Sequence, residues 1–331
     1  MSEYAIVVDN LVKKFGDLTA VDHISFKVEY GEIFGFLGPN GAGKTTTINV
    51  LVTLMKPTSG EAYVNGFNVV KEPIKVRESI GIVFQDNTVD RNLTGWENLY
   101  IHGLIYGMRG RELEDRIEDA LKFVDLHRFK DVVVKNYSGG MIRRLEIARA
   151  MIHRPKILFL DEPTLGLDPQ TRAKIWDYIM NLRNEYNVTI FLTTHYMDEA
   201  EQLCDRVAII DHGRIIALDT PDNLKSSIGK DIVYVKPMDN IDNTLLNELI
   251  DNNLIYSYKV SRDGYITFSV SNASEAIPRI FNKLSEYGVP IKEVRYTKPT
   301  LGDVFLYYTG RELREERGDW RDFIRMRRRV R

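Results

Sequence analysis

Short apolar runs alternate with helical patterns through the first half of the chain. Residues 32–38, 156–162 and 188–195 are almost continuously apolar, which is typical of strands that are covered on both faces. Residues 44–54 and 171–186 show the spacing of amphipathic helices instead. Strands that alternate with helices in this way predict an α/β fold with a largely parallel sheet.

The pattern becomes mainly helical over about residues 92–150. Thr94 and Glu97 have the spacing of a capping box, so a helix is expected to begin there. Further apolar residues recur at helical spacing, namely Leu113, Ile117, Leu121 and Val124. We predict a helical subdomain inserted into the α/β core.

A different rhythm begins after a break at residues 226–229. The pattern predicts strand, helix, strand, strand, helix and strand in turn, which is the βαββαβ order of a ferredoxin-like α+β domain. These elements are expected at residues 231–237, 244–251, 255–261, 265–271, 275–287 and 291–297, and a short helix is expected at residues 300–310. The predicted domains are residues 1–228, 229–310 and an arginine-rich tail at 311–331.

The composition describes an ordinary globular protein, with 44% apolar residues, 28% charged residues and a formal net charge of -2. Cys204 is the single cysteine, so no intramolecular disulfide can form, and we expect a buried thiol in a reducing compartment. No apolar run approaches the ~18 residues that cross a bilayer, and the first residues do not resemble a secretory signal.

The tail at residues 311–331 contains nine arginines and five acidic residues. Three interpretations remain open: a solvated tail with helical charge pairs, attraction to an anionic membrane leaflet or a permease, and nucleic-acid binding. The last is the least favoured because aromatic residues are sparse there and the whole chain is slightly acidic. We therefore expect no nucleic-acid partner.

A glycine-rich loop, GPNGAGKT at residues 38–45, follows a predicted strand and opens a predicted helix. This context is that of a P-loop, in which backbone N–H groups and a helix N-terminus bind phosphate. Lys44 is expected to reach the β- and γ-phosphates, and Thr45 to bind Mg²⁺. The expected nucleotide contacts in this loop are Gly38, Asn40, Gly41, Gly43, Lys44, Thr45 and Thr46. The core is therefore predicted to be a P-loop NTPase.

Two carboxylates, Asp161 and Glu162, end the predicted strand at residues 156–162. Strand ends of this kind face the ligand crevice of an open α/β sheet. Asp161 is expected to hold Mg²⁺ directly or through water. Glu162 is placed to polarise a water molecule against the γ-phosphate.

With the P-loop, the run DEPTLGLD at residues 161–168 resembles the nucleotide-binding subunits of ABC transporters, over about residues 4–225. Gln85 matches the Q-loop of that family, and His195 matches its switch histidine. Phe15 matches the aromatic position that stacks on adenine. The resemblance implies ATP and Mg²⁺ as cofactors, with Glu162, His195 and Gln85 as catalytic residues.

The resemblance also implies the remaining ligands of the site. The metal ligands are expected to be Thr45, Gln85 and Asp161, and Asp168 is expected to contact the nucleotide. Ser138, Gly139 and Gly140, within YSGGM, match the signature that is usually LSGGQ. The serine hydroxyl, the glycine N–H groups and the helix N-terminus, which bind the γ-phosphate across a dimer in this family, are all kept. Tyr137 and Met141 depart from the usual flanks, so the signature is a variant that we expect to work.

YSGGM and LGDVFLYYTG resemble the drug-export branch of daunorubicin-resistance ATPases. This implies a homodimer with ATP at its interface, peripheral at the cytoplasmic face of the cell membrane, that drives a separate integral-membrane permease. An importer ATPase is one alternative, but sugar importers often end in OB-like barrels instead of βαββαβ. A soluble ABC ATPase of translation or DNA repair is the other, but the sequence lacks the second nucleotide domain, long coiled coils or zinc-binding cysteines of such proteins.

Overall fold

The computed structural model describes residues 3–228, 231–238, 241–261 and 264–309 of the 331-residue chain. The predicted arginine-rich tail lies outside the described residues. None of the helices in the described ranges combines the length and the apolar character needed to span a bilayer.

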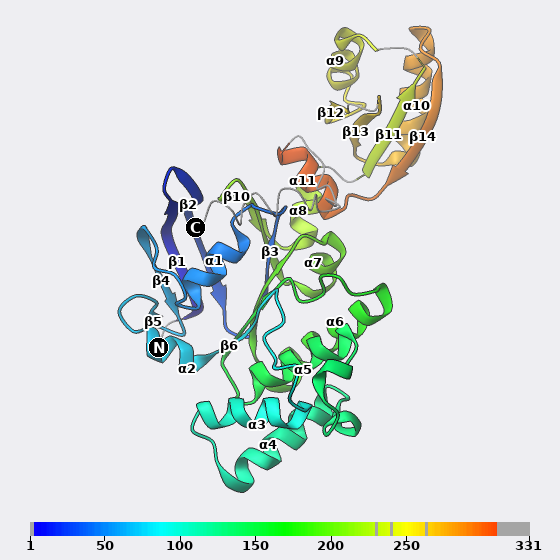
Figure 1. The fold of residues 1–331 in the computed structure, drawn as a ribbon. Helices are drawn as coiled ribbons and strands as arrows, with labels where there is room; N and C mark the ends of the chain where they lie inside the picture. The colour runs from blue at the N-terminus through cyan, green and yellow to red at the C-terminus, as the bar shows by residue number, and fades with distance from the viewer. Residues whose placement is uncertain (1–2, 229–230, 239–240, 262–263, 310–331) are drawn as a thin grey trace.

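The central sheet has six strands in the order β10-β9-β3-β8-β7-β6 (Figure 1). Five of them pair in parallel, and β10 pairs antiparallel with β9. All residues of β3, β7 and β8 are buried, which explains their continuous apolar runs. The strands are β3 Ile33–Leu37, β6 Ile80–Val83, β7 Ile157–Asp161, β8 Thr189–Thr194, β9 Arg206–Asp211 and β10 Arg214–Asp219. The predicted α/β class with a largely parallel sheet is confirmed.

The helices of this core are α1 Lys44–Leu51, α2 Pro73–Ser79, α6 Pro169–Tyr186, α7 Met197–Leu203 and α8 Pro221–Ser227. The predicted end of α1 at residue 54 is wrong, because Thr53 has a positive φ of 69° that a helix does not tolerate. The predicted start of α6 at residue 171 is also too late. Asp168 caps this helix and Pro169 occupies its first position, which suits the fixed φ of proline.

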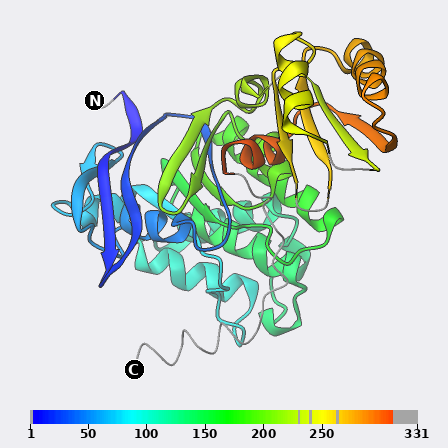
Figure 2. The ribbon, with the colours of Figure 1, turned by 90° about the horizontal axis from the view of Figure 1, so that it is seen from above.

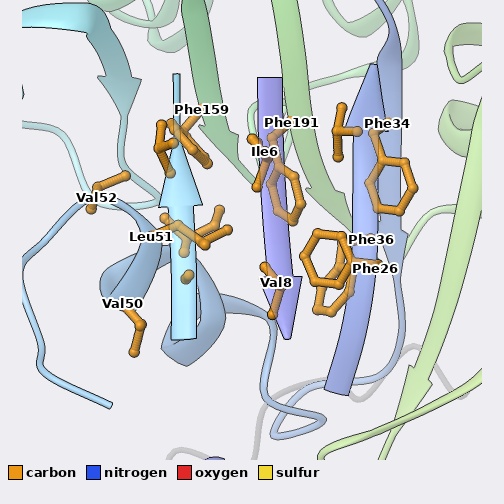
Figure 3. Packing of buried hydrophobic residues seen from close by; sticks show 14 of the residues in the cluster. Ile6, Val8, Phe26, Phe34, Phe36, Val50, Leu51, Val52, Phe159 and Phe191 are labelled. Carbon is orange, nitrogen blue, oxygen red and sulfur yellow. The ribbon is translucent and has the colours of Figure 1, made fainter. Parts of the chain in front are cut away.

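A second, antiparallel sheet covers one face of the core and was not among the predicted elements. Its order is β2-β1-β4-β5, with β1 Tyr4–Phe15, β2 Leu18–Glu29, β4 Ser59–Val64 and β5 Phe67–Asn68. Aromatic rings fill the space between the two sheets (Figure 3). Phe26 stacks on Phe34 at 5.4 Å and lies 5.9 Å from Phe191. This sheet and the C-terminal sheet lie on opposite sides of the central sheet (Figure 2).

The helical subdomain contains α3 Gly95–Ile105, α4 Gly110–Phe123 and α5 Gly139–Met151, with short 3-10 turns at His127–Phe129 and Val134–Asn136. The predicted capping box is present, because Thr94 Oγ1 accepts from the Glu97 amide and the Glu97 carboxylate accepts from the Thr94 amide. The four apolar residues at helical spacing, Leu113, Ile117, Leu121 and Val124, are fully buried in one cluster. The helical prediction for these residues is confirmed.

The C-terminal elements are β11 Asp231–Pro237, α9 Asn243–Asp251, β12 Ser257–Val260, β13 Ile266–Val270, α10 Ala273–Glu286 and β14 Ile291–Thr297. Their sheet has the order β12-β13-β11-β14, and all three pairings are antiparallel. The first strand thus lies between the third and the fourth, as in a ferredoxin-like βαββαβ fold. The predicted fold class is confirmed here as well.

The last described helix, α11 Leu301–Thr309, packs on α7 and α8 of the core (Figure 1). Its residues Leu301, Val304 and Phe305 are buried in the same cluster as the core strands β3, β7 and β8. The Leu301 amide donates to Glu201 of α7 at 2.7 Å. This helix therefore fastens the C-terminal sheet to the core. The proposed domain limits at residues 228 and 310 stay a prediction.

Candidate nucleotide-binding and hydrolysis site

The candidate site lies where β3, β7 and β8 end. These strands run in parallel, with Leu37 beside Thr194 and Asp161 beside Thr193. Their carboxyl ends therefore meet at one edge of the sheet, the position at which open α/β sheets bind ligands. The P-loop follows β3, the two acids end β7 and His195 follows β8, so three distant segments of the chain are brought together.

The P-loop is fitted closely against the sheet. A Cβ atom at Gly38 would lie 2.3 Å from the Ile210 carbonyl oxygen, and Gly43 has a φ of 107° with the Ala20 carbonyl oxygen equally close. Only glycine satisfies both the contact and the backbone angle there. The loop then enters α1, whose N-terminal amides supply the positive end of a helix dipole. The other expected phosphate contacts, Asn40, Gly41 and Thr46, lie on the same loop and first turn.

Lys44 extends back across the P-loop from the start of α1. Its Nζ donates to the carbonyl oxygens of Gly38 at 2.8 Å and Pro39 at 3.1 Å, and it lies 3.0 Å from Glu162 Oε1. Only 4% of the lysine surface is exposed, so a buried charge is balanced by a carboxylate and by two carbonyl dipoles. The lysine is held where the loop opens toward a phosphate.

Asp161 is a buried acid surrounded by hydroxyl groups. Its Oδ1 accepts from Thr193 Oγ1 at 2.6 Å and from Thr45 Oγ1 at 3.3 Å. Burial raises the pKa of this carboxyl above its ordinary value, although the two hydroxyl groups oppose the shift. Carboxylate and hydroxyl oxygens side by side are the ligand type that Mg²⁺ prefers. The residues present therefore fit a magnesium ion.

Glu162 joins the lysine to the histidine. Its Oε2 lies 3.0 Å from His195 Nδ1, while Oε1 faces Lys44. Burial acts to raise the pKa of this carboxyl, but the hydrogen bond from His195 and the charge of Lys44 outweigh it and lower the pKa. Glu162 also has a positive φ of 48°, and its amide donates to the Thr193 carbonyl and hydroxyl oxygens at 3.1 Å each. The main chain at this acid is thus set by β8.

Three expected ligands lie around this cluster, on the exposed surface. Gln85 follows β6 and is exposed, and its carbonyl oxygen accepts from Arg143 at 3.0 Å. Phe15 ends β1 with 44% of its surface exposed, and Lys13 Nζ lies 5.0 Å from its ring centre. Asp168 caps α6 by accepting from the Thr171 amide at 3.0 Å.

The signature residues open helix α5. Ser138 is exposed and caps the helix by accepting from the Met141 amide at 3.2 Å. Gly139 is exposed as well, and a Cβ atom at Gly140 would lie 2.4 Å from Thr171 of α6. The exposed helix N-terminus therefore presents a hydroxyl and two glycine amides to the surface, on a helix that is packed against α6.

Two parts of the chain match known families. Residues 21–165 match the family described as ABC transporter, and residues 220–309 match the C-terminal domain of DrrA1-3-like ATP-binding proteins. The daunorubicin resistance ATP-binding protein DrrA3 of Streptomyces coeruleorubidus is 38% identical over 95% of this chain and 98% of its own length. This chain belongs to the ATP-binding subunits of ABC transporters.

Other relatives agree with this membership. The linearmycin resistance ATP-binding protein LnrL of Bacillus subtilis is 36% identical over 93% of this chain and 99% of its own length. The Nod factor export ATP-binding protein I of Sinorhizobium fredii is 39% identical over 95% of this chain and 88% of its own length. The ABC protein described here is accordingly an ATP-hydrolysing subunit of an exporter.

Solved ABC cassettes share the fold. The cbiO1 protein of Clostridium perfringens, part of the ABC transporter complex cbiONQ, has a TM-score of 0.64 at 27% identity and covers 75% of this chain and 95% of its own. A dimeric cassette, MJ0796, bound to ADP and Pi in a post-hydrolysis state, has a TM-score of 0.60 at 30% identity and covers 65% of this chain and 98% of its own. The P-loop NTPase core and the ATP-binding activity that we predicted are confirmed.

The structure adds residues of this ABC site that the sequence analysis did not single out. Thr193 bonds both acids of β7 and is fully buried. A pair of threonines closing an otherwise apolar strand just before His195 was the available signal. Arg143 and Glu146 form a buried ion pair behind Gln85. Their only mark in the sequence was charge within a helix that also carries many apolar residues.

Proposed function

We propose that this ABC ATPase binds ATP with Mg²⁺ at the edge of the central sheet. The P-loop amides and Lys44 would hold the β- and γ-phosphates, and Thr45, Asp161 and Gln85 would hold the metal. The metal would supply neutralisation of phosphate charge. Support comes from the 3.3 Å contact between Thr45 and Asp161, which pairs a hydroxyl and a carboxylate oxygen as Mg²⁺ requires.

The observation that carries the proposed hydrolysis is the chain of contacts from Lys44 through Glu162 to His195, each 3.0 Å long. In the ATP complex Lys44 would contact phosphate oxygens in place of Glu162. Glu162 would then lose a cationic partner and face an added anion, and both changes raise a carboxyl pKa. We infer that Glu162 orients and deprotonates the attacking water, and that His195 holds Glu162 and the γ-phosphate in position.

The remaining contacts complete the nucleotide site. Phe15 would stack on the adenine ring, since it is an exposed aromatic residue at the end of β1. Ser138, Gly139 and Gly140 would bind the γ-phosphate held by the second subunit of a homodimer. Asp168 would lie near the same interface. The exposed N-terminus of α5 supports this arrangement because helix N-termini bind anions.

We propose that ATP-driven closure of the homodimer moves an integral-membrane permease, with this subunit peripheral at the cytoplasmic face of the membrane. The relatives carry daunorubicin, linearmycin and Nod factor in their names, and we infer that this protein also serves the export of a small organic molecule. The importer alternative is disfavoured by these relatives and by the ferredoxin-like C-terminal fold.

Glu162→Gln tests this proposal. The amide cannot accept the proton of the water, so the hydrolysis rate should fall by ~10²- to 10⁴-fold while ATP still binds. A dimer should then accumulate with ATP and Mg²⁺, as measured by gel filtration. Glu199→Gln is the matched control, because Glu199 is another buried acid, bonded to Thr164 and Trp176, and should retain most of the activity. Hydrolysis at the normal rate by Glu162→Gln would contradict the assigned role.

A further inference from the structure

Side chains of helix α5 bond the main chain of the segment that contains Gln85. Arg143 lies on the second turn of α5 and uses both of its terminal nitrogens. Nη1 donates to the Phe84 carbonyl oxygen at 2.6 Å, and Nη2 donates to the Gln85 carbonyl oxygen at 3.0 Å. One guanidinium therefore spans two consecutive peptide groups at the end of β6.

Glu146 continues this arrangement one turn further along α5. Its Oε1 accepts from the Thr88 amide at 2.7 Å, and its Oε2 lies 3.1 Å from Arg143 Nη1. Arg149, three residues on, donates to the Thr88 carbonyl oxygen at 2.7 Å. Residues three apart lie on one face of a helix, so these three charged side chains form a row along residues 84–88.

The row is costly to disturb. Glu146 is fully buried and Arg143 is 5% exposed, and a buried charge is tolerated only when it is paired and hydrogen-bonded. Burial raises the pKa of Glu146, and the nearby arginines together with the bonds from Thr88 oppose that shift. The planar fork of arginine can reach two carbonyl groups at once, which a lysine ammonium on its single stem does not reproduce.

We propose that Arg143 and Glu146 are positioning residues for Gln85, fixing the main chain of residues 84–88 to α5. This inference rests on the proposed role of Gln85 as a ligand in the ATP site. The same helix begins at Ser138, which faces the second ATP site of the dimer in our proposal. The row would thus make Gln85 of one site and the signature of the other move together, as a single mechanical unit.

Hydrogen exchange of the full-length protein without nucleotide tests the clamp directly. In Glu146→Gln and Arg143→Lys the amide of Thr88 and its neighbours should exchange about tenfold faster or more, the change expected when a charge-assisted hydrogen bond is lost. Arg143→Lys keeps the positive charge beside Glu146, so it guards against a variant that fails to fold.

Arg144→Ala is the matched control. Arg144 neighbours Arg143 on α5, but its Nη1 donates to the Val124 carbonyl oxygen in the helical subdomain. Exchange over residues 84–90 should stay unchanged in this variant. Equal acceleration in Arg143→Lys and Arg144→Ala would reduce Arg143 to a general stabilising role and overturn the inference.

A cycle with Gln85→Ala separates the inference from the proposed function. Arg143→Lys should lower kcat about tenfold, leave monomer ATP affinity within twofold, and have little further effect when Gln85 is already alanine. Multiplying effects in the double variant would overturn the positioning role alone. If Gln85→Ala by itself leaves kcat unchanged, the proposed role of Gln85 fails instead, and the inference with it.

Discussion

Thr193 holds both acids at the end of β7 through one hydroxyl group. It donates to Asp161 and accepts from the Glu162 amide, although it belongs to β8. The hydroxyl therefore sets the direction of the proposed metal ligand and of the proposed base together. A buried hydroxyl with two partners is difficult to replace, because removing it leaves both partners unsatisfied.

Replacing Thr193 with valine should therefore impair hydrolysis while keeping the shape of the strand. We expect kcat to fall by about tenfold or more and the free energy of unfolding to fall by about 1–2 kcal/mol, from the loss of two buried hydrogen bonds. Steady-state ATPase assays and urea denaturation measure the two effects. Thr193→Ser keeps the hydroxyl and should retain most activity; equal loss in both variants would assign the effect to packing.

The unusual flanks of the signature have a structural explanation at the residue scale. Tyr137 is buried, and its hydroxyl donates to the Phe129 carbonyl oxygen at 2.7 Å. Met141 packs against the apolar cluster of the helical subdomain. Both side chains thus point into the core of this subdomain, while Ser138 stays at the surface. The flanks serve packing, which agrees with a signature that retains its phosphate-binding groups.

At the scale of elements, helix α3 carries a histidine that is sensitive to acid. Burial, the charge of Arg149 and the neighbouring His153 lower the pKa of His102 to about 4. Its ring lies 5.1 Å from that of Tyr106 and 6.2 Å from that of His153, whose pKa is lowered by burial as well. The packing of α3 on α5 therefore favours neutral histidines.

This packing predicts that the protein loses stability on acidification. Between pH 6.5 and 4 the unfolded chain binds a proton at His102 that the folded chain does not, so the stability present above pH 6.5 is lost as the pH falls toward 4. His102→Gln should reduce the loss between pH 7 and pH 5 by about 1–2 kcal/mol, allowing for partial exposure. Denaturant titrations measure this. His212→Gln, at a side chain 78% exposed, is the control and should not change the slope.

Helix α11 shows that a C-terminal element belongs energetically to the core. Phe305 is 1% exposed and lies in the cluster of β3, β7 and β8. Phe305→Ala should lower the free energy of unfolding of the ATPase core by about 3–5 kcal/mol, the usual cost of a large buried side chain. Tyr307→Ala, on the same helix but 48% exposed, should cost far less. If Phe305→Ala leaves the unfolding of the core unchanged, α11 is not part of it.

At the scale of the whole molecule, the proposed ATP sites need two subunits. Ser138→Arg should block dimer formation, because its bulk would occupy the space for the γ-phosphate of the partner. ATP should still bind to the P-loop of the monomer. Fluorescent ATP analogue titration and gel filtration measure the two properties. Ser138→Ala loses the helix cap, worth about 1 kcal/mol, without added bulk, and should dimerise better than Ser138→Arg. Loss of monomer ATP binding in Ser138→Arg would contradict action across the dimer.

Much of this architecture is determined by local sequence. Fully apolar runs such as 188–195 specify buried parallel strands, because only strands covered on both faces need no polar alternation. The capping box at Thr94 and Glu97 and the GPNGAGKT loop act over a few residues, so they are readable without a fold. The βαββαβ order was readable as well, since each element there shows its own hydrophobic period.

Only the tertiary structure decided which distant residues meet. Thr193 bonds Asp161, and Arg143 bonds Gln85, across 32 and 58 residues of chain respectively. The N-terminal antiparallel sheet was missed because its strands β1 and β2 contain irregular pairing that breaks simple alternation. The place of α11 in the core depends on the surfaces of α7 and α8, which no local pattern of α11 contains. Contacts of this kind arise from packing between elements, so they are a property of the assembled molecule.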